Sequence, residues 1–423
     1  MKIKKEKNLS VREVSDNMEN PEEKLPDNDH RIIGQKLDIF SVNDNIGAGL
    51  PLFHPNGAML WKVCEDFMIN ELLKQGYQIV RSPHIFKAQV WKKSGHYAKF
   101  KEHMFLTEVD GNEFGIKPMN CPAHIHIYKH KSHSYRDLPI RLAEIGTVYR
   151  NELSGTLNGL TRVRGFAQDD AHIFCREDQI VDEVSKMLKL TADIYKAFGL
   201  KLSNVYLSTM PEKHLGDEKI WEKAEKALAG ALKKNKIKYE INKGDGAFYG
   251  PKIDSYVKDT LGRDWQLGTI QLDFNLPDRF KLFYVDKDNK KQRVVMLHRT
   301  IIGAMERLIA LLLERYNGAL PVWLAPIQVR VINMNDDLVK YAEKIEQKLR
   351  DIRIRVDSDY RSESVGKKVR EAEIQKIPFV IVIGDKEKQA GTLAVRSRGE
   401  RPKFGIKFDD FVKDLKKLEE SKK

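Results

Sequence analysis

Apolar residues recur at helical spacing near the N-terminal end, and this pattern predicts a helix followed by a strand. The helical positions between residues 60 and 72 are Leu60, Val63, Cys64, Phe67 and Leu72. Asn56 stands just before them, where its side chain is suited to cap the first turn of a helix. The strand-like segment from Tyr77 to Arg81 follows and ends at Ser82-Pro83.

The middle of the chain has the pattern of an antiparallel sheet. Two strand-like runs, Leu138 to Arg150 and Phe166 to Cys175, flank a loop rich in Gly, Ser, Asn and Arg. Further strands are expected at Ser255–Val257, Trp265–Phe274, Phe280–Val285 and Arg293–His298. A long helix from about Thr300 to Tyr316 closes this region, and Asn317-Gly318 ends the helix.

After Pro326 the pattern changes to alternating strands and helices. The strands are expected at IQVRVINM, IRIRVDS and FVIVIG, and helices are expected between them at about residues 336–350 and 365–376. The segment TLAVRSR and a lysine-rich C-terminal helix complete the region. Such alternation predicts a small, mostly parallel α/β domain over residues 327–423.

Charge and composition narrow the class of protein. Hydrophobic residues make up 41% and charged residues 32% of the 423 residues, as in an ordinary soluble globular protein. Lys and Arg together number 74, against 61 for Asp and Glu, which gives a net charge of +13. This excess favours a polyanionic partner such as nucleic acid. A lysine-rich proteome would give the same excess, so charge alone leaves the partner open.

The sequence also indicates the compartment. No apolar run approaches the roughly 18 residues that a membrane span needs. The three cysteines, Cys64, Cys121 and Cys175, are far apart and form no CxxC pair, as expected in a reducing compartment. Residues 1–28 are polar and carry acids and bases without an apolar core, so we expect a disordered or frayed extension and no signal or transit peptide. The expected location is the cytoplasm.

The segment FAQDDAHIF carries the first candidate chemistry. In a strand, alternation places Phe166, Gln168, Asp170 and His172 on one face, which combines an aromatic ring, an amide, a carboxylate and an imidazole. The solvated face of an antiparallel sheet would show the same alternation. From the residues alone, both interpretations stay open.

Arginines give the second candidate. The loop from Asn151 to Gly165 lies between Arg150 and Arg162-Val163-Arg164, and arginine forks match phosphate oxygens. A basic surface hairpin is an equally good interpretation. Gly303 and Arg307 stand four residues apart in the expected long helix, where an inward arginine is costly unless it meets an anion. A snorkelling arginine is the alternative.

The order of these features resembles the threonyl-tRNA synthetases. The motifs that carry the resemblance are KPMNCPAH, YRNE, GLTRVRGFAQDDAHIF, DGAFYGPKID, GTIQLDF and HRTIIGAMER. The segments IRVDSDYRSESVGKKVREA and IGDKE resemble the anticodon-binding domain of the same family. The resemblance runs from about Asp29 to Leu415. It implies an α+β catalytic domain over residues 29–322, with the class II antiparallel sheet flanked by helices, followed by a small α/β anticodon-binding domain over residues 327–423.

The resemblance implies an ATP-dependent ligation of L-threonine to tRNA(Thr) through a threonyl-adenylate, with Mg²⁺ accompanying ATP. Arg150 matches the catalytic arginine on the α-phosphate, and Glu152 matches the acid that reads the adenine amino group. Phe166 would stack on adenine, with the catalytic Arg307 on the opposite face and reaching the γ-phosphate. Arg162 would hold the outer phosphates.

The resemblance also implies a zinc ion, one per subunit, which recognises the amino and hydroxyl groups of threonine. Cys121, His172 and His298 match its three ligands, although by spacing alone they match no local zinc signature. Further matches around the amino acid and the adenylate are Gln168, Asp170, Tyr249, Lys252 and Gln266. His96 matches a catalytic histidine implicated in the transfer of the amino acid to tRNA.

Other positions match with less detail or depart from the family. Ser82-Pro83 and the preceding helix match motif 1, which implies a homodimer. Glu387 and Arg396 match positions that read the tRNA anticodon. Tyr149 replaces the histidine usual before the motif 2 arginine, and Ala123 replaces the glycine of NCPGH. Neither departure removes a ligand, but Ala123 puts the turn after Cys121 in doubt.

The core begins within about 30 residues, so we expect no editing domain in this chain. A separate protein would then edit seryl-tRNA, or the cell would tolerate it. The alternatives are another class II enzyme, such as a zinc-dependent seryl or a prolyl synthetase, and a catalytically inactive paralogue that binds RNA. The retained arginines and zinc ligands argue against the inactive paralogue.

Overall fold

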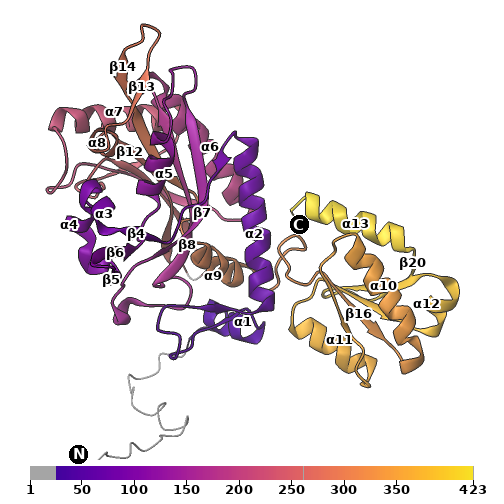
Figure 1. Ribbon diagram of the computed structural model, residues 1–423. Coiled ribbons are helices and arrows are strands. Elements are labelled where there is room, and N and C mark those ends of the chain that lie inside the picture. The colour runs from indigo at the N-terminus through magenta and orange to yellow at the C-terminus, as the bar shows by residue number, and fades with distance from the viewer. Residues whose placement is uncertain (1–24, 261, 423) are drawn as a thin grey trace, which may run out of the picture.

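The computed structural model describes residues 25–260 and 262–422 (Figure 1). Most of the polar extension expected at residues 1–28 therefore lies outside the described residues. One large apolar cluster extends from Ile33 to Leu324, and another extends from Val322 to Leu415. Each cluster forms the core of one domain. None of the helices described in these ranges combines the length and hydropathy needed to cross a membrane.

Two helices lead into the larger domain. Helix α1 (His30–Lys36) begins after Asp29, whose carboxylate accepts a hydrogen bond from the Arg31 amide at 2.9 Å. Helix α2 (Pro55–Lys74) confirms the helix predicted over residues 60–72. The predicted N-cap is wrong, because the helix begins at Pro55 with His54 as its N-cap, so Asn56 already lies in the first turn. The Asn56 amide instead donates to the Leu37 carbonyl at 3.1 Å.

An eight-stranded sheet forms the centre of the larger domain. The strands lie in the order β10-β9-β11-β12-β15-β8-β7-β3. Every pairing from β9 to β7 is antiparallel, which confirms the predicted antiparallel sheet, and only the two edge strands pair in parallel. The bounds in that order are Glu240–Asn242, Leu202–Ser208, Lys252–Lys258, Asp264–Asp273, Val295–Thr300, Gly165–Cys175, Ile140–Tyr149 and Gln78–Ile79.

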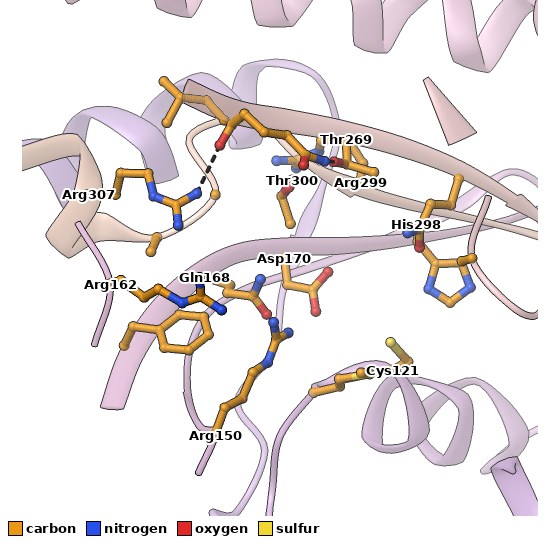
Figure 2. Close-up of a pocket in the computed structure, with 18 of the residues that line it drawn as sticks. Cys121, Arg150, Arg162, Gln168, Asp170, Thr269, His298, Arg299, Thr300 and Arg307 are labelled. Carbon is orange, nitrogen blue, oxygen red and sulfur yellow. Dashed lines mark hydrogen bonds between the residues drawn. The ribbon is translucent and has the colours of Figure 1, made fainter. Parts of the chain in front are cut away.

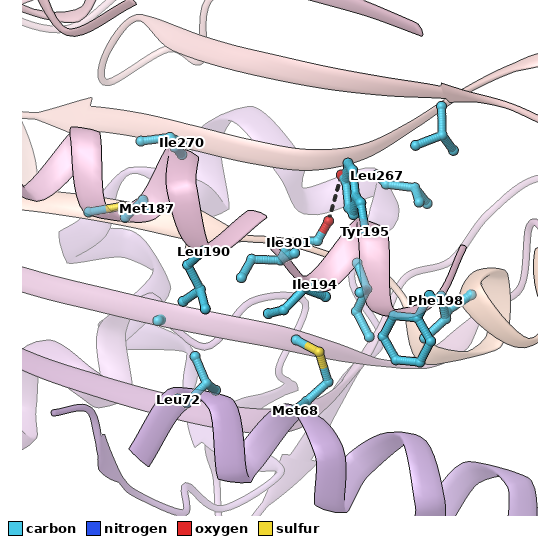
Figure 3. Packing of buried hydrophobic residues seen from close by; sticks show 14 of the residues in the cluster. Met68, Leu72, Met187, Leu190, Ile194, Tyr195, Phe198, Leu267, Ile270 and Ile301 are labelled. Carbon is cyan, nitrogen blue, oxygen red and sulfur yellow. Dashed lines mark hydrogen bonds between the residues drawn. The ribbon is translucent and has the colours of Figure 1, made fainter. Parts of the chain in front are cut away.

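The two faces of this sheet differ in chemistry. One face carries the polar side chains drawn in Figure 2, among them Gln168 and Asp170. The other face packs on helices α6 (Ile180–Ala197), α7 (Glu218–Lys234) and α9 (Met305–Tyr316). Apolar side chains from α2, α6 and the sheet meet there and exclude water (Figure 3). Of these three helices, the sequence pattern predicted α9 but neither α6 nor α7.

The helix predicted from Thr300 is wrong at its beginning. Residues up to Thr300 belong to strand β15, and α9 begins only at Met305. Gly303 lies in the turn between them with φ of +67°, and a Cβ there would approach the Leu267 carbonyl oxygen at 2.9 Å. Gly303 and Arg307 therefore do not share a helical face. The predicted end is confirmed, since Asn317 and Gly318 both have positive φ.

Smaller elements surround the sheet. The two-stranded and three-stranded sheets comprise β1 (Phe40–Ser41), β2 (Leu52–Phe53), β4 (Ile85–Lys87), β5 (Leu106–Val109), β6 (Asn112–Ile116), β13 (Phe283–Val285) and β14 (Lys291–Arg293). The short helices are α3 (Ala88–Ser94), α4 (His96–Phe100), α5 (Cys121–Lys129) and α8 (Asn275–Arg279). The strand predicted over residues 280–285 is thus shorter, because Phe280 caps α8.

The C-terminal domain has a five-stranded sheet in the order β17-β16-β18-β19-β20. Its strands, in chain order, are Val329–Asn333, Val356–Asp359, Phe379–Ile383, Leu393–Ser397 and Lys403–Ile406. Its helices are α10 (Val339–Asp351), α11 (Val365–Ile374), α12 (Asp385–Ala390) and α13 (Phe408–Glu420). The α/β prediction is confirmed, but the sheet is parallel only across its first three strands. Residues 384–392 are too few for the crossover that a parallel β19 requires.

A buried ion pair ties the sheet to the turn before α9. The Asp169 carboxylate accepts a hydrogen bond from Arg299 at 2.7 Å and others from the backbone amides of Ile301 and Ile302 at 2.8 and 2.9 Å. Both side chains of the pair are fully buried. Removing one partner of such a pair leaves the other charge buried and without a partner, which is costly.

We expect Asp169→Ala to lower the free energy of unfolding by about 3–5 kcal/mol, because it leaves the Arg299 charge and two amides unpaired. Chemical denaturation followed by tryptophan fluorescence measures the change. Asp193→Ala is the matched control, since Asp193 is 58% exposed and paired with the exposed Lys189. The control should lose no more than about 0.5 kcal/mol, and equal losses in the two variants would contradict the prediction.

Candidate active site

A cavity of about 520 Å³ lies over the polar face of the sheet (Figure 2). Strands β8, β12 and β15 form its floor, and the loop between β7 and β8 forms one side. The floor residues include Phe166, Gln168, Asp170, Gln266, Thr269, Gln271 and His298. Three arginines lie at one end of the cavity, and Cys121 and His298 lie at the other.

The alternation predicted along β8 is correct. Phe166, Gln168 and Asp170 line the cavity, and His172 joins Cys121 and His298 beside it. The residues between them point into the core on the other side, where Ala167, Ala171 and Ile173 are buried. The interpretation as a solvated sheet face is therefore wrong, because this face lines a cavity.

Three guanidinium groups share one end of the cavity, from Arg150, Arg162 and Arg307. Burial lowers the pKa of Arg150. Burial also lowers the pKa of Arg307, and the nearby charges of Arg162 and Arg150 lower it further. Like charges that repel one another in a partly dry cavity are stabilised when an anion binds between them. This end is therefore suited to a polyanion such as a chain of phosphates.

Backbone carbonyls hold Arg307 in place. Its Nε donates to the Thr161 carbonyl at 3.1 Å, and its Nη1 donates to the Gln266 carbonyl at 2.9 Å. Both bonds direct the guanidinium into the cavity, so the snorkelling alternative is wrong. Gly303 also lines the cavity, although it reaches it from the turn before α9.

Glu152 and Phe166 lie at the same end as the arginines. The Glu152 carboxylate accepts a hydrogen bond from Arg162 at 2.9 Å. The Arg150 guanidinium lies 5.1 Å from the centre of the Phe166 ring, within the range of a cation–π contact. Arg307 contacts the Trp265 ring at 5.7 Å instead. The structure thus brings the predicted nucleotide-binding residues together, and their contacts with adenine stay a prediction.

Three potential metal ligands meet at the other end. The ligand atoms of Cys121, His172 and His298 all lie within 4.8 Å of one another, and all three residues are buried. His172 Nε2 and His298 Nδ1 have no hydrogen-bond partner among the described residues. Burial lowers the pKa of His172 well below its usual value, so its imidazole is neutral. A thiol and two imidazoles, each with a nitrogen that has no hydrogen-bond partner among the described residues, fit the tetrahedral ligand set of zinc, with one position left over.

Residues that the sequence analysis missed orient these imidazoles. His172 Nδ1 lies 2.8 Å from His124 Nδ1, and His298 Nε2 lies 2.9 Å from the Asp273 carboxylate. His124 in turn contacts Glu144 at 3.2 Å. Such partners fix which ring nitrogen faces a metal. Their only signal in the sequence was that His124 and Asp273 belong to the motifs KPMNCPAH and GTIQLDF.

Polar side chains lie between the two ends. Asp170 is buried beside the ligand cluster, and the Asn120 amide donates to it at 3.3 Å. Burial raises the pKa of Asp170 above its usual value. Gln266 lines the cavity and donates to Asp254 at 2.6 Å, and the Tyr249 hydroxyl donates to Gln271. These groups are suited to hold a small polar ligand in one orientation.

Lys252 and His96, both predicted near the substrates, do not line the cavity. Lys252 pairs with Asp254 at 2.9 Å and with Asp245 at 3.1 Å. His96 is buried behind the cavity wall, where its Nδ1 lies 2.7 Å from the Ser94 hydroxyl and its ring packs on Phe248. Burial lowers the pKa of His96 to about 3. Neither residue contacts the cavity directly in this conformation.

The predicted anticodon residues lie in the C-terminal domain, and both have partners there. The Glu387 carboxylate accepts a hydrogen bond from the Gly384 amide at 3.1 Å and caps α12. Arg396, on β19, donates to Glu373 at 2.6 Å. A nucleotide that binds either side chain has to compete with these contacts. Their role in reading RNA stays a prediction.

Comparison with protein families agrees with this architecture. Residues 105–316 match the family described as tRNA synthetase class II core domain (G, H, P, S and T). Residues 328–418 match the family described as anticodon binding domain. The antiparallel sheet and its cavity are thus those of a class II aminoacyl-tRNA synthetase, followed by an anticodon-binding domain.

Individual relatives narrow the class. The chain is 49% identical to a threonine–tRNA ligase of Sulfurihydrogenibium sp. over 97% of its own length and 64% of that relative's. It is 47% identical to the threonine–tRNA ligase catalytic subunit of Saccharolobus islandicus, over 93% of this chain and 72% of the subunit.

Among solved structures, the RNA binding domain of threonyl-tRNA synthetase from Cryptosporidium parvum matches with a TM-score of 0.90 and 43% identity, over 92% of this chain and 98% of that one. The chain belongs to the threonyl-tRNA synthetase family, and it spans 64% of the length of the relative from Sulfurihydrogenibium.

Proposed function

We propose that this chain ligates L-threonine to tRNA(Thr) with ATP, through a threonyl-adenylate. One observation carries the proposal, namely that a cluster of three arginines and a cluster of three metal-binding side chains occupy opposite ends of one cavity. A nucleoside triphosphate at the arginine end and a small amino acid at the other end would fit this arrangement. Family membership supports the same reaction.

The arginine end would bind ATP together with Mg²⁺. Arg150 lines the cavity, and we assign it to the α-phosphate, where negative charge develops as the carboxylate attacks. Arg162 and Arg307 would hold the outer phosphates. Their fixed positions mean that little reorganisation is needed when the charge develops. Phe166 and Glu152 are assigned to the adenine ring.

The other end would bind threonine. Cys121, His172 and His298 would hold one zinc ion per subunit, which supplies coordination positions for the amino and hydroxyl groups of the substrate. Asp170 would accept a hydrogen bond from the threonine hydroxyl, with Gln168, Tyr249 and Gln266 around the carboxylate. We assign Lys252 and His96 to supporting positions, because neither lines the cavity.

The remaining proposals concern partners. Glu387 and Arg396 would contact the anticodon of tRNA(Thr), and Ser82-Pro83 with α2 would form a homodimer interface. The cytoplasmic location stays a prediction. We assign catalysis to the domain over residues 29–322 and anticodon binding to the domain over residues 327–423, in line with the two families matched. We also propose that this chain does not hydrolyse seryl-tRNA.

The metal assignment predicts one zinc ion per chain in the purified protein. Cys121→Ala should reduce the bound zinc to a small fraction of this value and abolish threonine activation, because two imidazoles alone form an incomplete site. Elemental analysis measures the metal without reference to activity. Cys64→Ala is the control, since this buried cysteine lies on α2 outside the cavity. Active wild-type protein without stoichiometric metal would contradict the assignment.

The reaction itself is tested by ATP–pyrophosphate exchange with a panel of amino acids. We expect exchange with threonine, none with proline, and a rate about 10²-fold lower for Arg150→Ala, because a preorganised charge partner is lost. Arg136→Ala, which changes an exposed arginine outside the cavity, should leave the rate unchanged. Preference for proline or serine would identify another class II enzyme, and no exchange at all would favour an RNA-binding paralogue.

The pocket should exclude valine well and serine poorly. Valine lacks the hydroxyl that Asp170 and the metal site would recognise, and a site built for a hydroxyl rejects such an analogue by roughly 10⁴-fold or more. Serine lacks only a methyl group, which gives roughly 10–200-fold discrimination. We expect seryl-tRNA(Thr) to form and to persist with excess enzyme. Deacylation well above the spontaneous rate would refute the expectation that this chain does not edit.

A further inference from the structure

A second buried cluster lies outside the cavity, where α1 packs against α9. Its members Asp29, His30 and Glu314 bring a carboxylate, an imidazole and another carboxylate within 4.8 Å. Both carboxylates have basic partners, because Asp29 pairs with Arg31 at 2.8 Å and Glu314 pairs with Arg263 at 2.7 Å. The cluster is therefore a satisfied hydrogen-bond network and has no free ligand set for a metal.

The histidine of this network contacts the loop that forms the wall of the cavity. The backbone amide of Leu160 donates to His30 Nε2 at 3.1 Å. Nε2 is thus an acceptor and carries no proton, so in the neutral imidazole the proton is on Nδ1. Nδ1 lies 2.7 Å from the Glu314 carboxylate and donates to it. The side chains of His30 and Glu314 are both fully buried, which makes an unpaired group there costly.

The loop is shaped to accept this contact. Gly159 has φ of +48°, and a Cβ at this position would lie 2.2 Å from His30 Nε2. Only a residue without a side chain lets the backbone approach the imidazole so closely. The next residues turn back on themselves, since the Thr161 amide donates to the Asn158 carbonyl at 2.9 Å.

The contact continues into the cavity. The Thr161 carbonyl, one residue after Leu160, accepts the hydrogen bond from Arg307 Nε at 3.1 Å. Arg162 follows directly and also lines the cavity. The buried imidazole of His30 thus contacts the loop segment that carries Arg162. The same segment accepts the hydrogen bond from Arg307.

We propose that His30 is a positioning residue for the ATP site, which holds the loop at residues 158–162 so that Arg162 and Arg307 face the phosphates. This inference rests on the proposed function, because it assumes that ATP occupies the arginine end. His30 itself does not line the cavity, so it acts through the loop and not on the substrate.

Two substitutions separate the two hydrogen bonds of His30. A glutamine side chain places its oxygen near the position of Nε2, so His30→Gln keeps an acceptor for the Leu160 amide and loses the donor to Glu314. An asparagine amide reaches only the position of Nδ1, so His30→Asn keeps the donor to Glu314 and leaves the Leu160 amide unpaired. His54→Asn is the control, since His54 also pairs with a carboxylate, that of Asp38, but is partly exposed.

The first readout needs no activity. Hydrogen exchange of a peptide that spans Leu160 should be at least about tenfold faster in His30→Asn than in wild type, because the amide loses its buried partner. Exchange in His30→Gln and in the His54→Asn control should match wild type. Thermal unfolding of each variant shows that the protein is folded at the temperature of the measurement.

The second readout is ATP–pyrophosphate exchange. His30→Asn should raise the KM for ATP about tenfold and leave the KM for threonine within about twofold, whereas His30→Gln should match wild type in both. A structural role alone would impair both variants and both substrates alike, and that result, or no effect in either variant, would overturn the inference. Wild-type protein without any exchange activity would overturn the proposed function, while hydrogen exchange would still decide whether His30 anchors the loop.

Discussion

The alternation of side chains along strand β8 is the constraint on which the rest of the larger domain depends. One face of β8 supplies Gln168, Asp170 and His172 to the site, and the intervening residues belong to the apolar core or, at Asp169, to a buried ion pair. A shift of one residue in register would exchange these two sets. Two pairings fix that register. Ten residues of β8 pair with β7 in antiparallel fashion, and His172 on β8 stands opposite His298 on β15.

The strand can carry such a polar face only because the opposite face is so thoroughly apolar. Crowded arginines and buried imidazoles with unpaired nitrogens are unfavourable in the protein by itself. Helices α6 and α9 bury a continuous apolar layer against the back of the same strands, which contributes the stability that these groups remove. The arginines and imidazoles are thus held in place for ligands before these bind. Their unfavourable burial lowers the stability of the protein, and the apolar core offsets this loss.

The sequence predicted those parts of the molecule that depend on local pattern. Alternation in FAQDDAHIF, the helix over residues 60–72 and the end of α9 at Asn317 follow from neighbouring residues and are confirmed. The beginning of α9 is wrong because apolar residues after Thr300 suit a helix, whereas Gly303 has to pass close to the Leu267 carbonyl on another strand. That contact joins segments distant in sequence, so the spacing of apolar residues after Thr300 cannot indicate it.

The candidate site shows the same division. Cys121 and the two histidines meet only when α5, β8 and β15 pack together. Their spacing in the sequence matches no local zinc signature, so only the resemblance to a family grouped them as ligands. His124, Asp273 and His30 were missed for a related reason. Each acts through a partner far along the chain, and although His124 and Asp273 lie in family motifs, no periodicity marks their role or that of His30.

Contacts between residues distant in sequence also hold the segment that connects the two domains. Arg355 of the C-terminal domain donates to the carbonyls of Val322, Trp323 and Ala325, and Arg398 donates to those of Ala319 and Leu320. Burial lowers the pKa of both arginines. A linker whose carbonyls are held by half-buried guanidinium groups is not a free tether. Five carbonyls between Ala319 and Ala325 are therefore held by side chains of the C-terminal domain, and these hydrogen bonds restrict the freedom of the linker.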